Sequence, residues 1–295
     1  MNLEKIIVIC CLNRRYEEKK DMIEIPESLT IAKQLNEMVQ GKRILEVETE
    51  HSAHSYVWYS GKTDFYSNVM TGRIIDKAIG IGSMIEVTMG GYSFVVGDGT
   101  NIRYIKQGEK LPEKYQARIT LEDESHLICK VQMYGAIFLI QPHKEKNPYY
   151  LVAKEKPLPN TEGFTYQYFK SLFDDISATM SMKAFLATEQ RIPGLGNGVL
   201  QDILLEAGFH PKRKIGTITE SGRQRIYESI VETLEKMTIA GGRNTEKDLF
   251  GNVGGYQTLL SKKTVGKPCP YCGSLIEKAS YMGGTVYFCP MCQEI

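Results

Sequence analysis

The chain has 295 residues, and 36 lysines and arginines almost balance 35 aspartates and glutamates, which gives a formal net charge of +1. Hydrophobic residues make up 42% and charged residues 24%, a composition that excludes collagen-like, low-complexity and intrinsically disordered chains. Its apolar runs are all shorter than the roughly 18 residues of a membrane-spanning helix, and its length predicts about two domains.

Residues 1–21 combine a short apolar stretch with a charged run. The apolar part is at the short end for a signal peptide and no small-residue cleavage site follows it, so we expect a cytoplasmic protein. Residues 22–27 look like a second beginning, because Pro26 suits the first turn of a helix that the apolar spacing predicts over 28–40. We therefore interpret residues 1–21 as an over-called start, with an added N-terminal arm as the alternative.

Between residues 42 and 155 the pattern changes to short runs rich in Val, Ile and aromatic residues, separated by glycine-rich and acidic turns. Such runs predict an antiparallel β-sandwich or barrel rather than alternating strands and helices. The expected strands are 43–47, 74–79, 84–89, 92–96, 117–121, 126–131 and 136–140.

After a Pro-containing linker the pattern becomes helical, with helices expected over 181–188, 199–207 and 221–237. We thus predict an α+β, multidomain chain. Its parts are an N-terminal segment (1–21), a β-sandwich domain with flanking helices (22–155), a linker (156–175), a helical domain (176–262) and a small cysteine-containing unit (263–295).

Two CxxC pairs, Cys269-Pro-Tyr-Cys272 and Cys289-Pro-Met-Cys292, are separated by 16 residues. This spacing predicts one tetrahedral zinc site, because each tight turn directs two thiolates at the same ion. Thiolates fill all four positions and leave none for water, so we expect one structural Zn²⁺ at the base of a hairpin. A redox-active dithiol pair is the alternative.

The glycine-rich turn over residues 192–198 precedes the helix expected at 199–207. Free N–H groups at a helix N-terminus favour phosphate, and Asn197 adds a neutral donor and acceptor. Lys183, Arg191 and the run Lys212-Arg213-Lys214 flank this turn and would suit a DNA backbone. The alternative is a tight helix–helix turn surrounded by solvated lysines.

A second candidate contact with DNA is aromatic. Tyr56, Trp58 and Tyr59 would suit stacking on an exposed base, but we favour packing in a core or an interface.

Several segments, in order along the chain, resemble the formamidopyrimidine-DNA glycosylase / endonuclease VIII family. They are Glu24-Ile-Pro-Glu27, Gly194-Leu-Gly-Asn197, Ala207-Gly-Phe-His-Pro211, Gly254-Gly-Tyr256 and the terminal CxxC–CxxC ribbon. The resemblance implies a β-sandwich domain, a helix–two-turns–helix domain and a zinc hairpin, with duplex DNA held between the lobes. It also implies excision of oxidised bases and strand cleavage by β-elimination through a Schiff base.

The resemblance assigns proton transfer to Glu24 and phosphate contacts to Lys183 and Asn197. The family's N-terminal proline, which supplies the attacking amine, is replaced by Ile23. An unusual N-terminus at Met22 or Ile23, or a lysine such as Lys183, would have to replace this amine; a hydrolytic route through Glu24 is the other option.

Three further family groups are absent at the matching positions. The phosphate-binding lysine of the sandwich is Ile81, the arginine that fills the flipped base's void is Met133 (followed by Tyr134), and the hairpin-tip arginine is Gly284.

We therefore expect a monomeric, cytoplasmic and nucleoid-associated DNA repair protein that binds damaged or abasic double-stranded DNA, with no membrane partner. By resemblance it is a DNA glycosylase and abasic-site lyase. Its expected site residues are Glu24 for catalysis, Lys183, Asn197, Lys212 and Arg213 for DNA, and the four cysteines for zinc. The alternative is a catalytically inactive, zinc-containing binder of distorted DNA.

Overall fold

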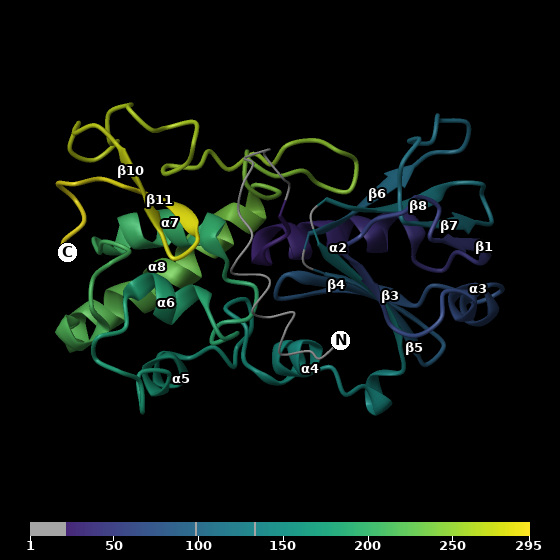
Figure 1. Cartoon of the computed structure of the whole chain (residues 1–295), viewed down its shortest axis with the longest axis horizontal. Helices are drawn as coiled ribbons and strands as arrows, with labels where there is room; N and C mark the ends of the chain where they lie inside the picture. The colour runs from purple at the N-terminus through teal and green to yellow at the C-terminus, as the bar shows by residue number, and fades with distance from the viewer. Residues whose placement is uncertain (1–21, 98, 133) are drawn as a thin grey trace.

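The computed structural model describes residues 22–97, 99–132 and 134–295, so the expectations for residues 1–21 and for Met133 lie outside the described residues. Figure 1 shows two lobes, with the strands of a sandwich on one side and a helical lobe carrying a C-terminal hairpin on the other. The mixed α+β architecture expected from the sequence is confirmed.

The sandwich consists of two sheets, with strand orders β1-β7-β8-β6 and β2-β9-β5-β4-β3. All neighbouring strands are antiparallel except β2 and β9, which are parallel. The strands are β1 (Ile44–Thr49), β2 (Val57–Tyr59), β3 (Lys77–Ile81), β4 (Met84–Met89), β5 (Tyr92–Gly97), β6 (Thr100–Ile105), β7 (Ala117–Leu121), β8 (His126–Val131) and β9 (Gly135–Ile140). Alternating apolar side chains from both sheets enclose the sandwich core, as their period of two requires.

The sequence pattern missed four elements of this lobe, one of which, the helix α4 (Pro148–Glu155), packs on the five-stranded sheet. β6 carries the polar residues Thr100, Asn101 and Arg103 among its six positions, and β2 has only three residues. The helix α3 (Asp64–Met70) buries only Tyr66 and Met70, which is too short a pattern for periodicity to reveal. The strand expected over 74–79 is β3, displaced to Lys77–Ile81.

The helix α2 (Ile25–Val39) connects the lobes (Figure 1). Ile25 packs in the helical core, whereas Ile31, Leu35 and Val39 pack in the sandwich core. The helix begins three residues before its expected start because Glu24 is its N-cap, and the Glu27 side chain accepts a hydrogen bond from the Glu24 N–H at 3.2 Å.

The helical lobe contains α5 (Tyr166–Ser171), α6 (Met182–Ala187), α7 (Asn197–Ala207) and α8 (Glu220–Ile239), while α4 (Pro148–Glu155) covers the five-stranded sheet. Two 3₁₀ turns span Pro142–Lys144 and Ile215–Thr217. The expected linker 156–175 contains α5, and Phe164, Phe169 and Phe173 within it are buried in the helical core. This stretch is therefore folded structure rather than a bare connection, because its aromatic side chains bury apolar surface.

The chain returns to the sandwich after α8. Leu249, within the expected helical domain, is buried in the sandwich core, and its carbonyl accepts a hydrogen bond from the Tyr104 N–H at 3.0 Å. The last element is an antiparallel hairpin of β10 (Glu277–Tyr281) and β11 (Gly284–Phe288). Within the described part of the chain, no helix combines the length and apolar character needed to cross a bilayer.

Candidate functional site

The Glu24 carboxylate lies at the N-terminus of α7, where the two lobes meet. Its Oε1 accepts a hydrogen bond from the Gly198 N–H and its Oε2 from the Val199 N–H, both at 2.9 Å. The side chain is buried, and the helix N-terminus favours its negative charge. The glycine turn was expected to offer these N–H groups to phosphate, but in this structure a carboxylate of the same chain accepts two of them.

The glycines of this turn provide room for the contacts between lobes. A Cβ at Gly196 would lie 2.6 Å from the Glu24 Cδ, and one at Gly198 would lie 1.6 Å from an Arg243 Nη1. Gly194 has φ of +80°, and a Cβ there would lie 2.2 Å from the Gly82 backbone carbon. A side chain at any of these positions would push Glu24, Arg243 or the β3–β4 turn out of place.

Arg243 is buried beside Glu24 and is held by Glu27. Its Nε and Nη2 donate to the two Glu27 carboxylate oxygens at 3.0 and 2.7 Å, and its Nη1 lies 3.4 Å from the Glu24 Oε1. Burial disfavours the charged guanidinium, but the carboxylates of Glu24 and Glu27 outweigh it and raise the pKa of Arg243. The guanidinium thus fixes the carboxylates of the N-cap, Glu24, and of the first turn of α2, Glu27.

A third carboxylate, that of Glu246, completes this cluster. Its Oε2 accepts a hydrogen bond from the Met22 N–H at 2.6 Å, and burial raises the pKa of Glu246 to about 8 despite the nearby Arg243. Sequence reasoning missed both Arg243 and Glu246, because they follow an ordinary helix stop and no motif marks them. Ile23, which the resemblance matches to the family's proline, is a buried residue of the sandwich core.

Two of the expected phosphate ligands lie where the helical lobe meets the hairpin. Lys183 is buried, and its Nζ donates to the Tyr281 carbonyl at 2.8 Å. The Asn197 Nδ2 donates to the Thr285 carbonyl at 3.0 Å, while its buried Oδ1 has no partner. Both side chains therefore connect the helices to the backbone of the hairpin.

The remaining basic residues differ in their surroundings. Lys212 is exposed, with its Nζ 5.4 Å from the centre of the Tyr281 ring. Arg213 instead donates to the Ile295 carbonyl at 3.0 Å and to the Thr217 hydroxyl at 2.7 Å. Arg191 is buried and donates to the Phe185 carbonyl at 2.7 Å, so it supports a turn rather than a charged surface.

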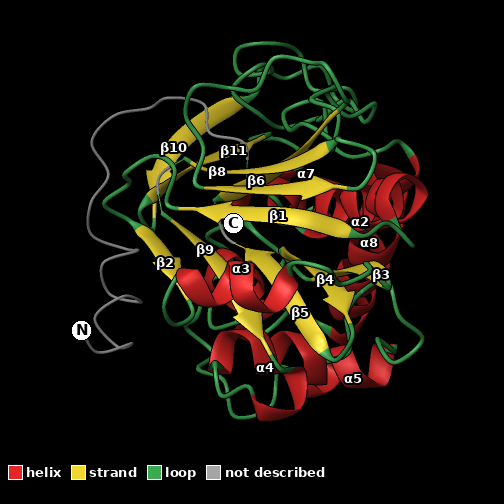
Figure 2. Cartoon of the chain, turned by 90° about the vertical axis from the view of Figure 1, so that its right-hand side faces the viewer, coloured by secondary structure: helices red, strands yellow, loops and turns green. Residues whose placement is uncertain are grey.

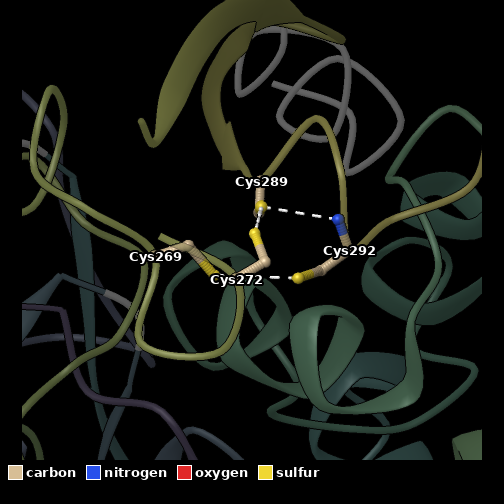
Figure 3. Close-up of side chains that lie close together, drawn as sticks. All are labelled: Cys269, Cys272, Cys289 and Cys292. Carbon is tan, nitrogen blue, oxygen red and sulfur yellow. Dashed lines mark hydrogen bonds between the residues drawn. The ribbon is translucent and has the colours of Figure 1, made fainter. Parts of the chain in front are cut away.

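The four hairpin cysteines converge (Figure 3). Their sulfur atoms all lie within 4.8 Å of one another, with 3.8 Å between Cys269 and Cys292 and 3.4 Å between Cys272 and Cys289. A tetrahedral ion with zinc–sulfur bonds of about 2.3 Å would place its sulfur ligands roughly 3.8 Å apart. The donor set and its spacing therefore fit zinc, and the described cysteines are free thiols rather than disulfides.

Two of the positions that the resemblance matches to cationic groups of the family lie within the described residues. Ile81 is buried against the apolar cluster that includes Met84 and Val95, and Gly284 begins β11. Neither position carries a charge, so binding of DNA phosphates would depend on other cationic side chains of this chain.

Comparisons with known proteins give one consistent result, although no protein-family model matches the chain. A formamidopyrimidine-DNA glycosylase of Bacillus cereus is 26% identical over 280 residues, covering 92% of this chain and 99% of the relative.

Solved structures agree in fold. The Lactococcus lactis Fpg in complex with DNA containing an abasic site has a TM-score of 0.79 and 23% identity, covering 92% of this chain and all of that one. MutM in complex with DNA containing carbocyclic 8-oxo-G has a TM-score of 0.79 and 24% identity over the same shares.

Proposed function

We propose, from the premise that this chain belongs to the formamidopyrimidine-DNA glycosylase family, that it acts in base excision repair as a DNA glycosylase and abasic-site lyase. The observation that carries the proposal is the Glu24 carboxylate, fixed at the junction of the lobes by two N–H groups of α7 and by Arg243. Relatives and structural neighbours named for this activity, or bound to abasic and 8-oxo-G DNA, support the choice of substrate.

The proposed DNA contacts lie around the hairpin. Lys212 is exposed and available to a phosphate, whereas Lys183 and Asn197 would have to exchange their hairpin carbonyls for one. Arg213 would have to leave the C-terminal carbonyl of Ile295. One structural Zn²⁺ on Cys269, Cys272, Cys289 and Cys292 would keep the two CxxC turns together and the hairpin in a single conformation.

In the proposed reaction an amine of the protein attacks C1′ of the opened abasic sugar, and water leaves as the C=N bond forms. Loss of a proton from C2′ then expels the 3′ phosphate, which breaks the strand. Glu24 would move protons to and from the sugar, as a carboxylate held beside the reacting atoms can.

We place the attacking amine at residue 22, in a chain that begins there. Its nitrogen lies 2.6 Å from the Glu246 Oε2, and an ammonium at this position would give the carboxylates of Glu24, Glu27 and Glu246 a second cation besides Arg243. An α-amino group ordinarily has a pKa of about 7.7–8.0, against about 10.4 for lysine. Neighbouring carboxylates raise the pKa of an ammonium at residue 22, so Glu246 would have to accept its proton before the neutral amine attacks. Lys183 is the competing amine, and its hydrogen bond to the hairpin favours a structural role.

Borohydride trapping on a duplex with one abasic site tests this assignment. The chain from residue 22 should form a covalent adduct that peptide mapping places at Met22, and Lys183→Met should form it too. An adduct that disappears in Lys183→Met would move the nucleophile to that lysine. Tight binding without either adduct or cleavage would identify a catalytically inactive binder of damaged DNA.

A further inference from the structure

Four strands of the five-stranded sheet each have one end in a common row, and one end of that row contacts the helical lobe. β4 begins and β5 ends at this edge, with Ile85 opposite Val96; β9 begins there, with Ala136 opposite Gly97. The β3–β4 turn at the same end contacts the helical lobe, because Gly82 packs directly against Gly194. The row therefore begins beside the turn that precedes α7 and Glu24.

Tyr56 lies at the other end of this row. β2 runs parallel to β9 with Val57 opposite Gly135, and the Gly135 N–H donates to the Tyr56 carbonyl at 3.0 Å. Three steps between neighbouring strands, of about 4.8 Å each, separate the beginning of β4 from the beginning of β2 by roughly 15 Å. A single bound DNA duplex is long enough to contact both ends of this row. In Figure 2, β2 and the hairpin strand β10 both lie toward the left of the molecule.

The three aromatic residues of this segment have different surroundings. Tyr59 packs against the sandwich core, and its hydroxyl donates to the Gln116 carbonyl at 3.0 Å. Trp58 is 42% exposed and lies edge-on to Phe138, with 4.6 Å between ring centres. Tyr56 is 64% exposed, and its ring contact is an edge-on approach to His54 at 6.5 Å. Packing explains Tyr59 and much of Trp58, but it leaves most of Tyr56 in solvent.

The backbone beside Tyr56 is held in place. Gly99 has φ of +67°, and a Cβ there would lie 2.2 Å from the Tyr134 carbonyl oxygen, so the Tyr134 backbone packs directly on this glycine. The Gln132 N–H also donates to the Gly99 carbonyl at 3.0 Å. Tyr56 thus directly precedes the edge strand β2, and its carbonyl is held by the first residue of the well-supported β9, which lowers the entropic cost of stacking on its ring.

We propose that Tyr56 is a base-stacking residue, which binds the unpaired nucleobase opposite an abasic site in the bound duplex. The inference rests on the proposed function and names a contact for the undamaged strand. A neutral aromatic ring at a sheet edge suits any nucleobase, because every base offers a π-face and stacking does not depend on sequence. The backbone of residue 56 stands on the row that starts at the Gly82–Gly194 contact, and this row links it to the site of Glu24.

Fluorescence anisotropy with an abasic duplex and an otherwise identical intact duplex tests the proposal. Tyr56→Ala should weaken binding to the abasic duplex about 5- to 150-fold, the effect of losing one base–aromatic stack, and should leave binding to the intact duplex within about twofold. Tyr56→Phe should retain wild-type affinity. Phe65→Ala is the matched control: Phe65 is 41% exposed and lies against Tyr92, at the opposite end of β5.

Photocrosslinking gives an independent readout. With 5-iodouracil opposite the abasic site, irradiation should attach the DNA to the peptide that contains Tyr56, and Tyr56→Ala should lose this adduct. Equal affinity of Tyr56→Ala and wild type, or a crosslink elsewhere, would overturn the stacking role alone. A wild-type protein that ignores abasic DNA at low salt would overturn both this role and the proposed function.

Discussion

Replacing Glu24 with glutamine separates the carboxylate's chemistry from its packing. The two carboxylate oxygens accept the N–H groups of Gly198 and Val199, each at 2.9 Å. Glutamine offers one oxygen and one NH₂ group, so one of these buried N–H groups would face a donor instead of an acceptor. Losing a hydrogen bond to a charged group costs about 1.5–3 kcal/mol, and we expect Glu24→Gln to lower the free energy of unfolding by that amount.

The effect on catalysis should be larger than the effect on stability. Removing a general acid–base group typically costs about 10²- to 10⁴-fold, so single-turnover cleavage of an abasic duplex should slow by that factor while the dissociation constant changes little. Glu37→Gln, an exposed position on the same helix, should leave both unchanged. Cleavage by Glu24→Gln at the wild-type rate would refute the assignment of proton transfer to this residue.

Three other changes probe the charge cluster and the hairpin. Arg243→Met removes the buried partner of Glu27 and should lower the free energy of unfolding by about 3–5 kcal/mol in urea titrations; a change below about 1 kcal/mol would contradict the role of this ion pair. Because burial raises the pKa of Glu246 to about 8, above its ordinary value of about 4.5, the folded chain binds this proton more tightly and loses stability as pH rises between these values. Glu246→Gln should flatten that part of the profile of urea midpoint against pH, and an unchanged slope would exclude Glu246 as its source. Chelation of zinc should release one ion per chain and abolish binding to abasic duplex while sheet circular dichroism persists; full binding by the metal-free protein would argue against a structural ion.

The sequence pattern predicted the elements whose residues by themselves show a clear apolar period between turns. The strands expected at 84–89, 117–121 and 126–131 have the observed bounds, because each alternates or concentrates apolar residues between clear turns. β2 escaped prediction because three residues carry little pattern, and its strand character comes from parallel pairing with β9. α5 was hidden behind a proline-containing stretch, although its aromatic residues pack in the helical core.

In the candidate site, too, contacts within a short stretch of sequence could be predicted, whereas contacts between distant residues could not. The cysteine spacing alone predicted four converging sulfur atoms, since each pair sits within one tight turn. By contrast, Arg243 and Glu27 are 216 residues apart, and Glu24 is 174 residues from the Gly198 N–H that it accepts. No local pattern encodes such pairings, so the glycine turn could be recognised as the start of a helix but not as the partner of a carboxylate.

Equilibrium binding to an abasic-site duplex and to the matched intact duplex, measured over a range of salt concentrations, tests the central claim most directly. We predict tighter binding to the abasic duplex. The logarithm of the binding constant should fall linearly with the logarithm of the salt concentration, because cationic side chains release counterions when they contact phosphates. Equal affinity for both duplexes, or no binding even at low salt, would contradict it.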